Sequence, residues 1–255
     1  MARLQHLLLA FVFAALWSVP QADAQTRRPQ VVIELFTSQG CSSSPTADTV
    51  IGELSRDPEI ITLTFPVTYW DYLGWKDTLG QDVFGKRQKL YAKARGDNQI
   101  YTPQAIINGS IHVVGSEKDE LRRRIRDGEA ASFKATMSLK EDGGTLRIRL
   151  TPLPGATGNT GSVWVLPILR EVAVAISGGE NRGKTITYSN VVRGLIRVGN
   201  WDGKESEISV PLVTTQAPDA DDYVVIVQAE KPGRFNYTYP GDILAAARSG
   251  RSASQ

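Results

Sequence analysis

The fold is decided by one short stretch, which reads Phe36-Thr37-Ser38-Gln39-Gly40-Cys41-Ser42-Ser43-Ser44-Pro45. The segment that leads into it, Val31 to Phe36, is largely apolar and rich in β-branched side chains, which is typical of a buried strand. The residues after it predict a helix, because Pro45 suits a first helical turn. Apolar side chains then recur at i, i+3, i+4 and i+7, as expected for one helical face: Ala47, Val50, Ile51 and Leu54. Cys41, the only cysteine in the chain, is therefore expected in a turn between a strand and a helix.

Strand and helix patterns continue to alternate through the first half of the chain. Apolar strand patterns cover residues 60–67, 104–107 and 111–114, and helical patterns cover residues 81–95 and a segment that begins near Ser116. Asn108-Gly109 is a strong hairpin signal, so the last two of these strands are expected to pair antiparallel. The order β-α-β-α-β-β-α predicts an α/β domain over residues 28–129, in which helical crossovers join parallel strands.

The second half of the sequence has a different pattern. From residue 130 onward, short apolar and β-branched segments are separated by Gly, Pro, Asn and Asp turns. This spacing predicts a separate β-rich domain over residues 130–248, resembling a small antiparallel β-sandwich. Gly241 to Arg248 is expected to form a short closing helix or tail. Residues 249–255 are small and polar, so we expect a disordered tail there.

The N-terminus has the features of a secretory signal peptide. Arg3 and His6 precede an apolar run, Leu7 to Trp17, and Ala22-Asp23-Ala24 is a small-x-small cleavage site. We expect residues 1–24 to be removed and the mature protein to be periplasmic or secreted, with no stable membrane anchor. The alternative is an uncleaved anchor, although the run is shorter than the roughly 20 apolar residues that span a bilayer.

Composition excludes several classes of function. The hydrophobic fraction is 41%, the charged fraction 22% and the formal net charge +2, which does not favour nucleic acid as a partner. The chain has 2 histidines, and His6 would leave with the signal peptide. A histidine-rich metal site or a Ser-His-Asp triad is therefore not expected, and the sequence implies no metal and no cofactor.

The element order, a C-x-x-S motif at the first helix and Thr102-Pro103 before the third strand together resemble the thioredoxin fold. The resemblance implies that Pro103 forms a cis peptide and lies beside Cys41, with Thr102 next to the site. More narrowly, the chain resembles a bacterial secreted family of unknown function with a thioredoxin-like domain. The strings that carry this resemblance are residues 34–43, 69–77, 101–104, 180–183 and 187–193.

Two positions depart from that family. Its members usually have a second cysteine where this chain has Ser44, and a histidine where it has Pro66. A dithiol and an internal disulfide are therefore impossible, and any redox chemistry must use one sulfur. In a dithiol protein the second cysteine releases the substrate, so a mixed disulfide on Cys41 is expected to persist until an external thiol resolves it.

The predicted turn favours a reactive thiol. The orphan N–H groups and the macrodipole at a helix N-terminus stabilise an anion, so the pKa of Cys41 is expected to be lowered. The hydroxyls of Ser42, Ser43 and Ser44 can donate hydrogen bonds to the sulfur, and we expect the thiol to be at least partly accessible. The alternative is that these serines only cap the helix and that Cys41 is a relic.

An aromatic stretch follows the second predicted strand and includes Trp70, Tyr72 and Trp75. Ligands of open α/β sheets bind at the carboxyl ends of strands, where this stretch, Cys41 and Pro103 are all expected. The aromatic side chains can therefore line a groove for a peptide or small ligand, or they can cover the sheet edge. Residues 180–183 form a polar turn that either contacts the first half of the chain or is a plain hairpin turn.

These observations leave two main hypotheses and a weaker third. The first is thiol–disulfide exchange through Cys41, with a thiol- or disulfide-bearing protein or a small thiol as partner. The second is a non-catalytic periplasmic binding or scaffold module with a relic redox site. The third is metal or iron–sulfur ligation by Cys41 together with an external thiol, which the lack of further ligands disfavours.

Overall fold

The computed structural model describes residues 29–127, 132–156, 158–233 and 237–250. The expected signal peptide, residues 1–24, lies outside the described residues, and so do residues 251–255 of the expected tail. Ser249, which the sequence assigned to that tail, is instead buried, and its N–H donates to the carbonyl oxygen of Tyr223. Among the described residues, every helix is too short or too polar to span a bilayer.

The first half of the chain has the predicted order of elements. They are β1 (Val31–Thr37), α1 (Ser44–Leu54), β2 (Ile60–Pro66), the 3-10 helix η1 (Asp71–Leu73), α2 (Asp82–Arg95), β3 (Gln104–Ile107), β4 (Ile111–Val114) and α3 (Lys118–Arg126). Strand β1 pairs parallel with β2 and antiparallel with β3, and β3 pairs antiparallel with β4. The hairpin between β3 and β4 turns at Asn108 and Gly109, both of which have positive φ.

The second half consists of strands and one further 3-10 helix within its described residues. They are β5 (Ala135–Asp142), β6 (Thr145–Pro152), β7 (Gly161–Ala175), β8 (Thr185–Val192), β9 (Ile196–Trp201), β10 (Ser206–Pro211), η2 (Leu212–Thr215), β11 (Asp222–Pro232) and β12 (Thr238–Arg248). The expected helix or tail at Gly241–Arg248 is wrong, because these residues belong to β12. They are rich in alanine, but pairing with β11 and burial outweigh helical propensity.

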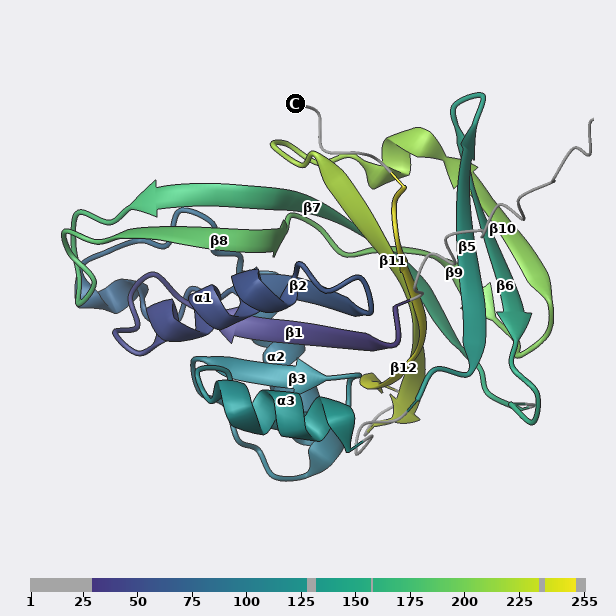
Figure 1. Ribbon diagram of the computed structural model, residues 1–255, viewed down its shortest axis with the longest axis horizontal. Coiled ribbons are helices and arrows are strands. Elements are labelled where there is room, and N and C mark those ends of the chain that lie inside the picture. Colours follow the sequence, from purple (N-terminus) through teal and green to yellow (C-terminus); the bar gives the residue numbers. More distant parts are fainter. Residues whose placement is uncertain (1–28, 128–131, 157, 234–236, 251–255) are drawn as a thin grey trace, which may run out of the picture.

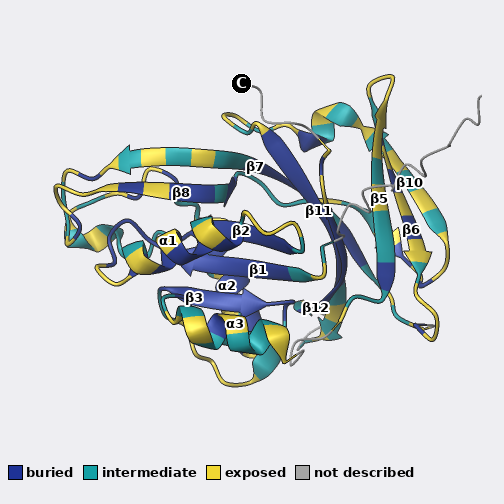
Figure 2. Cartoon of the chain, viewed as in Figure 1, coloured by how far each residue is buried: buried dark blue, intermediate teal, exposed yellow. Residues whose placement is uncertain are grey.

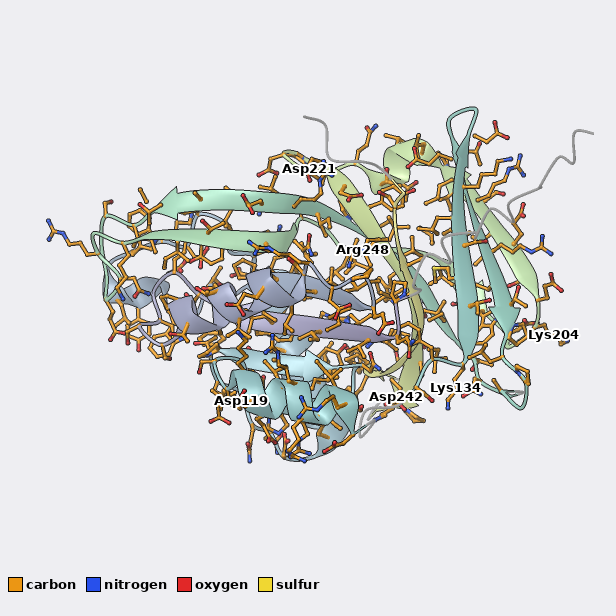
Figure 3. The ribbon with its side chains drawn as sticks, viewed as in Figure 1. Asp119, Lys134, Lys204, Asp221, Asp242 and Arg248 are labelled. Carbon is orange, nitrogen blue, oxygen red and sulfur yellow. The ribbon has the colours of Figure 1, made fainter. Side chains whose placement is uncertain are left out.

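One large sheet runs through both halves of the chain. Its strand order is β12-β11-β7-β8-β2-β1-β3-β4, and β9 pairs with β7 off this path. The two halves meet where β2 pairs parallel with β8, at Thr64 and Val191. The Thr64 hydroxyl donates to the Ser189 carbonyl at 2.6 Å, and Arg248, labelled in Figure 3, donates to the Ile60 carbonyl. The sheet thus crosses the boundary expected near residue 129.

A second sheet, of three strands in the order β10-β6-β5, lies at the opposite end of the molecule from α1 (Figure 1). Its inner face packs on the large sheet through a cluster that includes Leu146, Ile148, Val163 and Trp201. The alternating burial of β6 fits a strand with one face on a core and the other in solvent. The three-stranded sheet therefore packs on a large sheet that also contains strands of the first half of the chain.

The main core also joins the two halves. Phe36, Phe65 and Phe84 from the first half share one apolar cluster with Ile226 and Ile243 from the second half. The rings of Phe36 and Phe65 stack with centroids 5.3 Å apart. Figure 2 shows this continuity as buried residues along β1, β2 and β11, while exposed residues recur along the ends of β7 and β8 that lie away from the three-stranded sheet.

A buried polar network lies within the same region. The Arg87 guanidinium donates to Glu34, Tyr91 and Gln228 at 2.8–2.9 Å. Glu34 and Tyr91 are fully buried, and Gln228 comes from β11 in the second half. The network therefore satisfies a buried ion pair with partners from both halves of the chain.

Candidate functional site

The thiol of Cys41 lies in the turn between β1 and α1, as predicted. The Cys41 N–H donates to the Ser38 carbonyl at 3.2 Å, and the Ser44 N–H donates to the Cys41 carbonyl at 3.1 Å. Cys41 is only 4% exposed, so the expectation of a partly accessible thiol is wrong. Trp70 covers this turn closely, since a Cβ atom on Gly40 would lie 3.0 Å from the Trp70 Cβ. Glycine is needed at position 40 for this approach.

Hydrogen bonds hold the sulfur in place. The Sγ atom lies 3.2 Å from the Ser43 hydroxyl and 3.6 Å from the Thr102 carbonyl oxygen. Burial raises the pKa of the Cys41 thiol, but contacts with Ser43, Ser44 and Thr102 lower it by more in total. The net pKa is therefore below the ordinary value. Ser43 is the N-cap of α1, yet within the described chain its hydroxyl makes no capping hydrogen bond. Its contact is instead with the thiol, which argues against a purely structural cap.

The Thr102–Pro103 peptide bond lies beside the thiol, because the Thr102 carbonyl oxygen is 3.6 Å from Sγ. The Thr102–Pro103 peptide is cis, as the resemblance to thioredoxin-like proteins implied. The Thr102 hydroxyl accepts a hydrogen bond of 2.7 Å from the indole N–H of Trp70. The fold thus brings together three separate segments of the chain, which contain Cys41, Trp70 and the Thr102–Pro103 pair.

The three aromatic residues expected to bind substrate have different environments. Tyr72 is 76% exposed and its ring stacks on Trp70, with centroids 6.3 Å apart. Trp75 is half-buried, and its indole N–H donates to the Gln39 side-chain oxygen at 2.7 Å. Trp75 therefore helps to hold the Cys41 turn, whereas Tyr72 is exposed and contacts Trp70.

The polar turn at residues 180–183 does contact the first half of the chain. The Asn181 side chain is fully buried, and its amide donates to the carbonyl oxygens of both Gln39 and Cys41 at 2.9 Å. The Glu180 carboxylate accepts from the Ser42 N–H at 3.1 Å. The second half of the chain thus fixes the backbone on both sides of Gly40.

Asp77 supports the same turn from the aromatic stretch. Its carboxylate accepts from the backbone N–H groups of Gln39 at 2.8 Å and Leu79 at 3.0 Å. Burial raises the pKa of Asp77 to about 6, although these hydrogen bonds act in the opposite direction. The sequence leaves two roles open for Asp77 in the aromatic stretch, hydrogen bonding to the backbone and titration near the thiol, and the structure shows the hydrogen bonds.

Asp48 was not predicted as a site residue. It lies one helical turn after Ser44 on the same face of α1, and it is 2% exposed. Within the described residues, neither carboxyl oxygen makes a hydrogen bond of normal geometry. Burial raises its pKa well above the ordinary value, and the nearby Thr37 hydroxyl lowers it only in part. Asp77 and Cys41 raise it further through their charges.

The described residues contain no group of three or more histidine, cysteine, aspartate and glutamate side chains that could hold a metal ion. Cys41 is surrounded by hydroxyl groups and backbone carbonyls instead.

Comparison with known proteins identifies the family. The family model described as "Protein of unknown function (DUF1223)" matches residues 32–228, so the chain belongs to this family. A crystal structure of protein AGR_C_4864 from Agrobacterium tumefaciens, a structural genomics target, is similar to this chain, with a TM-score of 0.72 and 30% sequence identity. The similarity covers 89% of this chain and 97% of that one. No curated protein shows significant similarity to the chain.

Proposed function

We propose that this member of a family of unknown function is an exported, thioredoxin-like protein that exchanges disulfides through Cys41 alone. The parallel pair β1 and β2, followed by the antiparallel strands β3 and β4, supports the thioredoxin-like layout of the first half. The pattern of residues 1–24 supports export. The observation that carries the proposal is a thiol with a lowered pKa, held by Ser43 beside Thr102.

The reaction is a displacement at sulfur. The Cys41 thiolate attacks one sulfur of a disulfide, the bond between the two partner sulfurs breaks, and the other partner sulfur leaves as a thiolate. Cys41 is then joined to the partner by a mixed disulfide. Ser44 has no sulfur with which to release it, so a second, external thiol completes the exchange by attacking the same bond. The partner is a protein thiol or disulfide, or a small thiol.

The surroundings of Cys41 suggest how a partner is held. Tyr72 offers exposed aromatic surface, and the Thr102 backbone lies next to the sulfur. Trp70 links these two features, because its ring stacks on Tyr72 and its indole N–H donates to the Thr102 hydroxyl. Because Cys41 is 4% exposed, neighbouring groups must shift before a disulfide reaches the sulfur.

The experiment measures thiol reactivity and exchange together. The iodoacetamide reactivity of Cys41 is titrated against pH, with Cys41→Ser as the blank, and we expect a midpoint below the free-thiol value of about 8.5. The Ser44→Cys variant is assayed for insulin reduction, which we expect it to catalyse because it restores a C-x-x-C pair. Wild type is expected to trap stable mixed disulfides that the variant resolves.

Burial of Cys41 favours the second candidate, a binding module in which the thiol is a relic. That candidate replaces the first if Cys41 does not react in the folded protein and Ser44→Cys has no reductase activity. A reactive thiol with a midpoint at or above about 8.5 also counts against redox function.

A further inference from the structure

A cluster of buried polar groups lies behind the Cys41 sulfur. It comprises the hydroxyls of Thr37, Ser44 and Tyr188 and the carboxyl of Asp48. Within the described part of the chain, none of these groups makes a hydrogen bond of normal geometry. Buried polar groups are nearly always paired, so four in one place require a functional explanation.

The members of the cluster are linked to one another and to the thiol. Ser44 is near enough to Cys41 to lower the pKa of its thiol, and Thr37 is near enough to Asp48 to lower the pKa of its carboxyl. A charge on Cys41 raises the pKa of Asp48, and a charge on Asp48 raises the pKa of Tyr188. The Ser44 hydroxyl near the sulfur and the Thr37 hydroxyl near the carboxyl are both groups that can donate and accept a proton.

Asp48 is also one of the residues that line a groove on the surface. The groove lies between α1 and β8 and has a volume of about 850 Å³. The helix and the strand approach closely beneath it, since a Cβ atom on Gly52 would lie 3.2 Å from the Ser189 hydroxyl. Figure 1 shows β7 and β8 extending beside α1, away from the three-stranded sheet. Asp48 is among the residues that line this groove, although it is almost completely buried.

We propose that Asp48 is the proton-exchange group of Cys41, which takes up the thiol proton across the buried hydroxyls and releases it into the groove between α1 and β8. The proposal rests on the proposed thiol chemistry and adds a residue and a route to it. In the first step the S–H bond of Cys41 breaks and an O–H bond forms on Asp48, which leaves a thiolate and a neutral carboxyl. No electrons are transferred. When the thiolate enters a mixed disulfide, its charge is lost and Asp48 can release the proton to solvent.

The charged surroundings of Asp48 are consistent with a neutral carboxyl beside a thiolate. Thr37 on β1 and Tyr188 on β8 lie near its carboxyl. Asp77, in the loop after η1, is the nearby group whose negative charge affects it. Neither Thr37 nor Tyr188 supplies a positive charge, and Asp77 opposes ionisation. The charged residues along the rest of the groove are Glu53, Arg56, Arg170, Glu171 and Lys184.

The first test compares pH profiles of Cys41 alkylation by iodoacetamide in wild type, Asp48→Asn and Glu53→Gln. If the thiol and the carboxyl share one proton, the thiolate of wild type forms in two steps as pH rises, because the two groups titrate together. In Asp48→Asn only the thiol titrates, so its thiolate forms in one step. Between the two steps the variant should react about twofold faster, because equal sharing leaves the thiolate in about half of the wild-type molecules. Glu53→Gln is the matched control, since Glu53 lies on the same helix and lines the same groove but is exposed.

The second test needs no variant. The Asp48 carboxyl carbon is titrated by NMR in the wild-type protein before and after Cys41 is capped by iodoacetamide. Capping removes the thiolate charge, so the Asp48 midpoint should fall. An unchanged midpoint, or identical profiles for wild type and Asp48→Asn, overturns this inference while leaving the exchange proposal intact. Absence of any alkylation of folded protein instead contradicts the exchange proposal itself.

Discussion

The contact between Asn181 and the Cys41 turn leads to a prediction about stability and thiol reactivity. The Asn181 amide makes two hydrogen bonds of 2.9 Å to backbone carbonyl oxygens, and its side chain is fully buried. A typical intramolecular hydrogen bond contributes about 1 kcal/mol, so losing both costs about 2 kcal/mol. Truncation also leaves buried carbonyl groups without this donor, and we expect Asn181→Ala to lower the free energy of unfolding by about 2–4 kcal/mol.

A second variant separates hydrogen bonding from packing. Asn181→Asp preserves volume but replaces the donor with an ionised acceptor that faces two carbonyl oxygens, so its loss of stability should be at least as large. Arg182→Ala, an exposed neighbour in the same turn, is the control and should change stability by less than about 0.5 kcal/mol.

The assay is urea denaturation followed by fluorescence, combined with iodoacetamide labelling of Cys41 in the folded protein. We expect both Asn181 variants to unfold at lower urea and to be labelled faster, because the turn between β7 and β8 no longer holds the turn around Cys41. Wild-type stability and wild-type labelling in Asn181→Ala would refute the idea that the second half of the chain positions the thiol.

Three further predictions concern features that support the site or the fold. The pKa of Asp77 is raised from 3.8 to about 6, so the folded state holds an extra proton between these pH values and the contribution of Asp77 to stability falls as pH rises through this window. The unfolding free energy of wild type relative to Asp77→Asn should therefore fall by on the order of 3 kcal/mol between pH 4 and pH 7, and a constant difference in urea titrations would contradict this. Gly109 has φ +75°, and a Cβ atom there would lie 2.3 Å from a carbonyl oxygen of β12. Gly109→Ala should thus cost more in thermal unfolding than Gly143→Ala, which meets nothing within 4 Å and should cost only about 1–2 kcal/mol for its positive φ. Arg87→Met leaves the Glu34 carboxylate buried without its cation and should cost about 3–5 kcal/mol in urea unfolding, whereas the double variant with Glu34→Leu should recover most of the loss.

Features encoded by neighbouring residues could be predicted from the sequence. The turn at Cys41, the helix that follows Pro45 and the Asn108-Gly109 hairpin all depend on local conformational preferences. The position of Pro103 beside the thiol came from resemblance to a known fold, because no local signal brings residues 41 and 103 together.

Features set by distant contacts could not be predicted. The strand at Leu244–Ala247 has helix-forming side chains, and only pairing with β11 fixes its conformation. The contact of Asn181 with Cys41 joins residues 140 positions apart. A signal for Asp48 was present, since it lies four residues after Ser44 and therefore on its helical face, but only the structure shows that β8 buries that face.

The pairing of β2 with β8 also has a consequence for the order in which the chain can fold. Residues 29–127 leave the ribosome first, yet Phe36, Phe65 and Phe84 complete their apolar cluster only with side chains of β11 and β12. The nascent first half therefore carries a thiol turn, an open strand edge and uncovered aromatic rings until β12 is synthesised. We expect ribosome-bound chains that stop before β12 to be cut readily by protease within residues 29–127, and full-length chains to resist. We therefore expect chaperones to bind the chain as one long unfolded segment, because the first half completes its core only with strands of the second half.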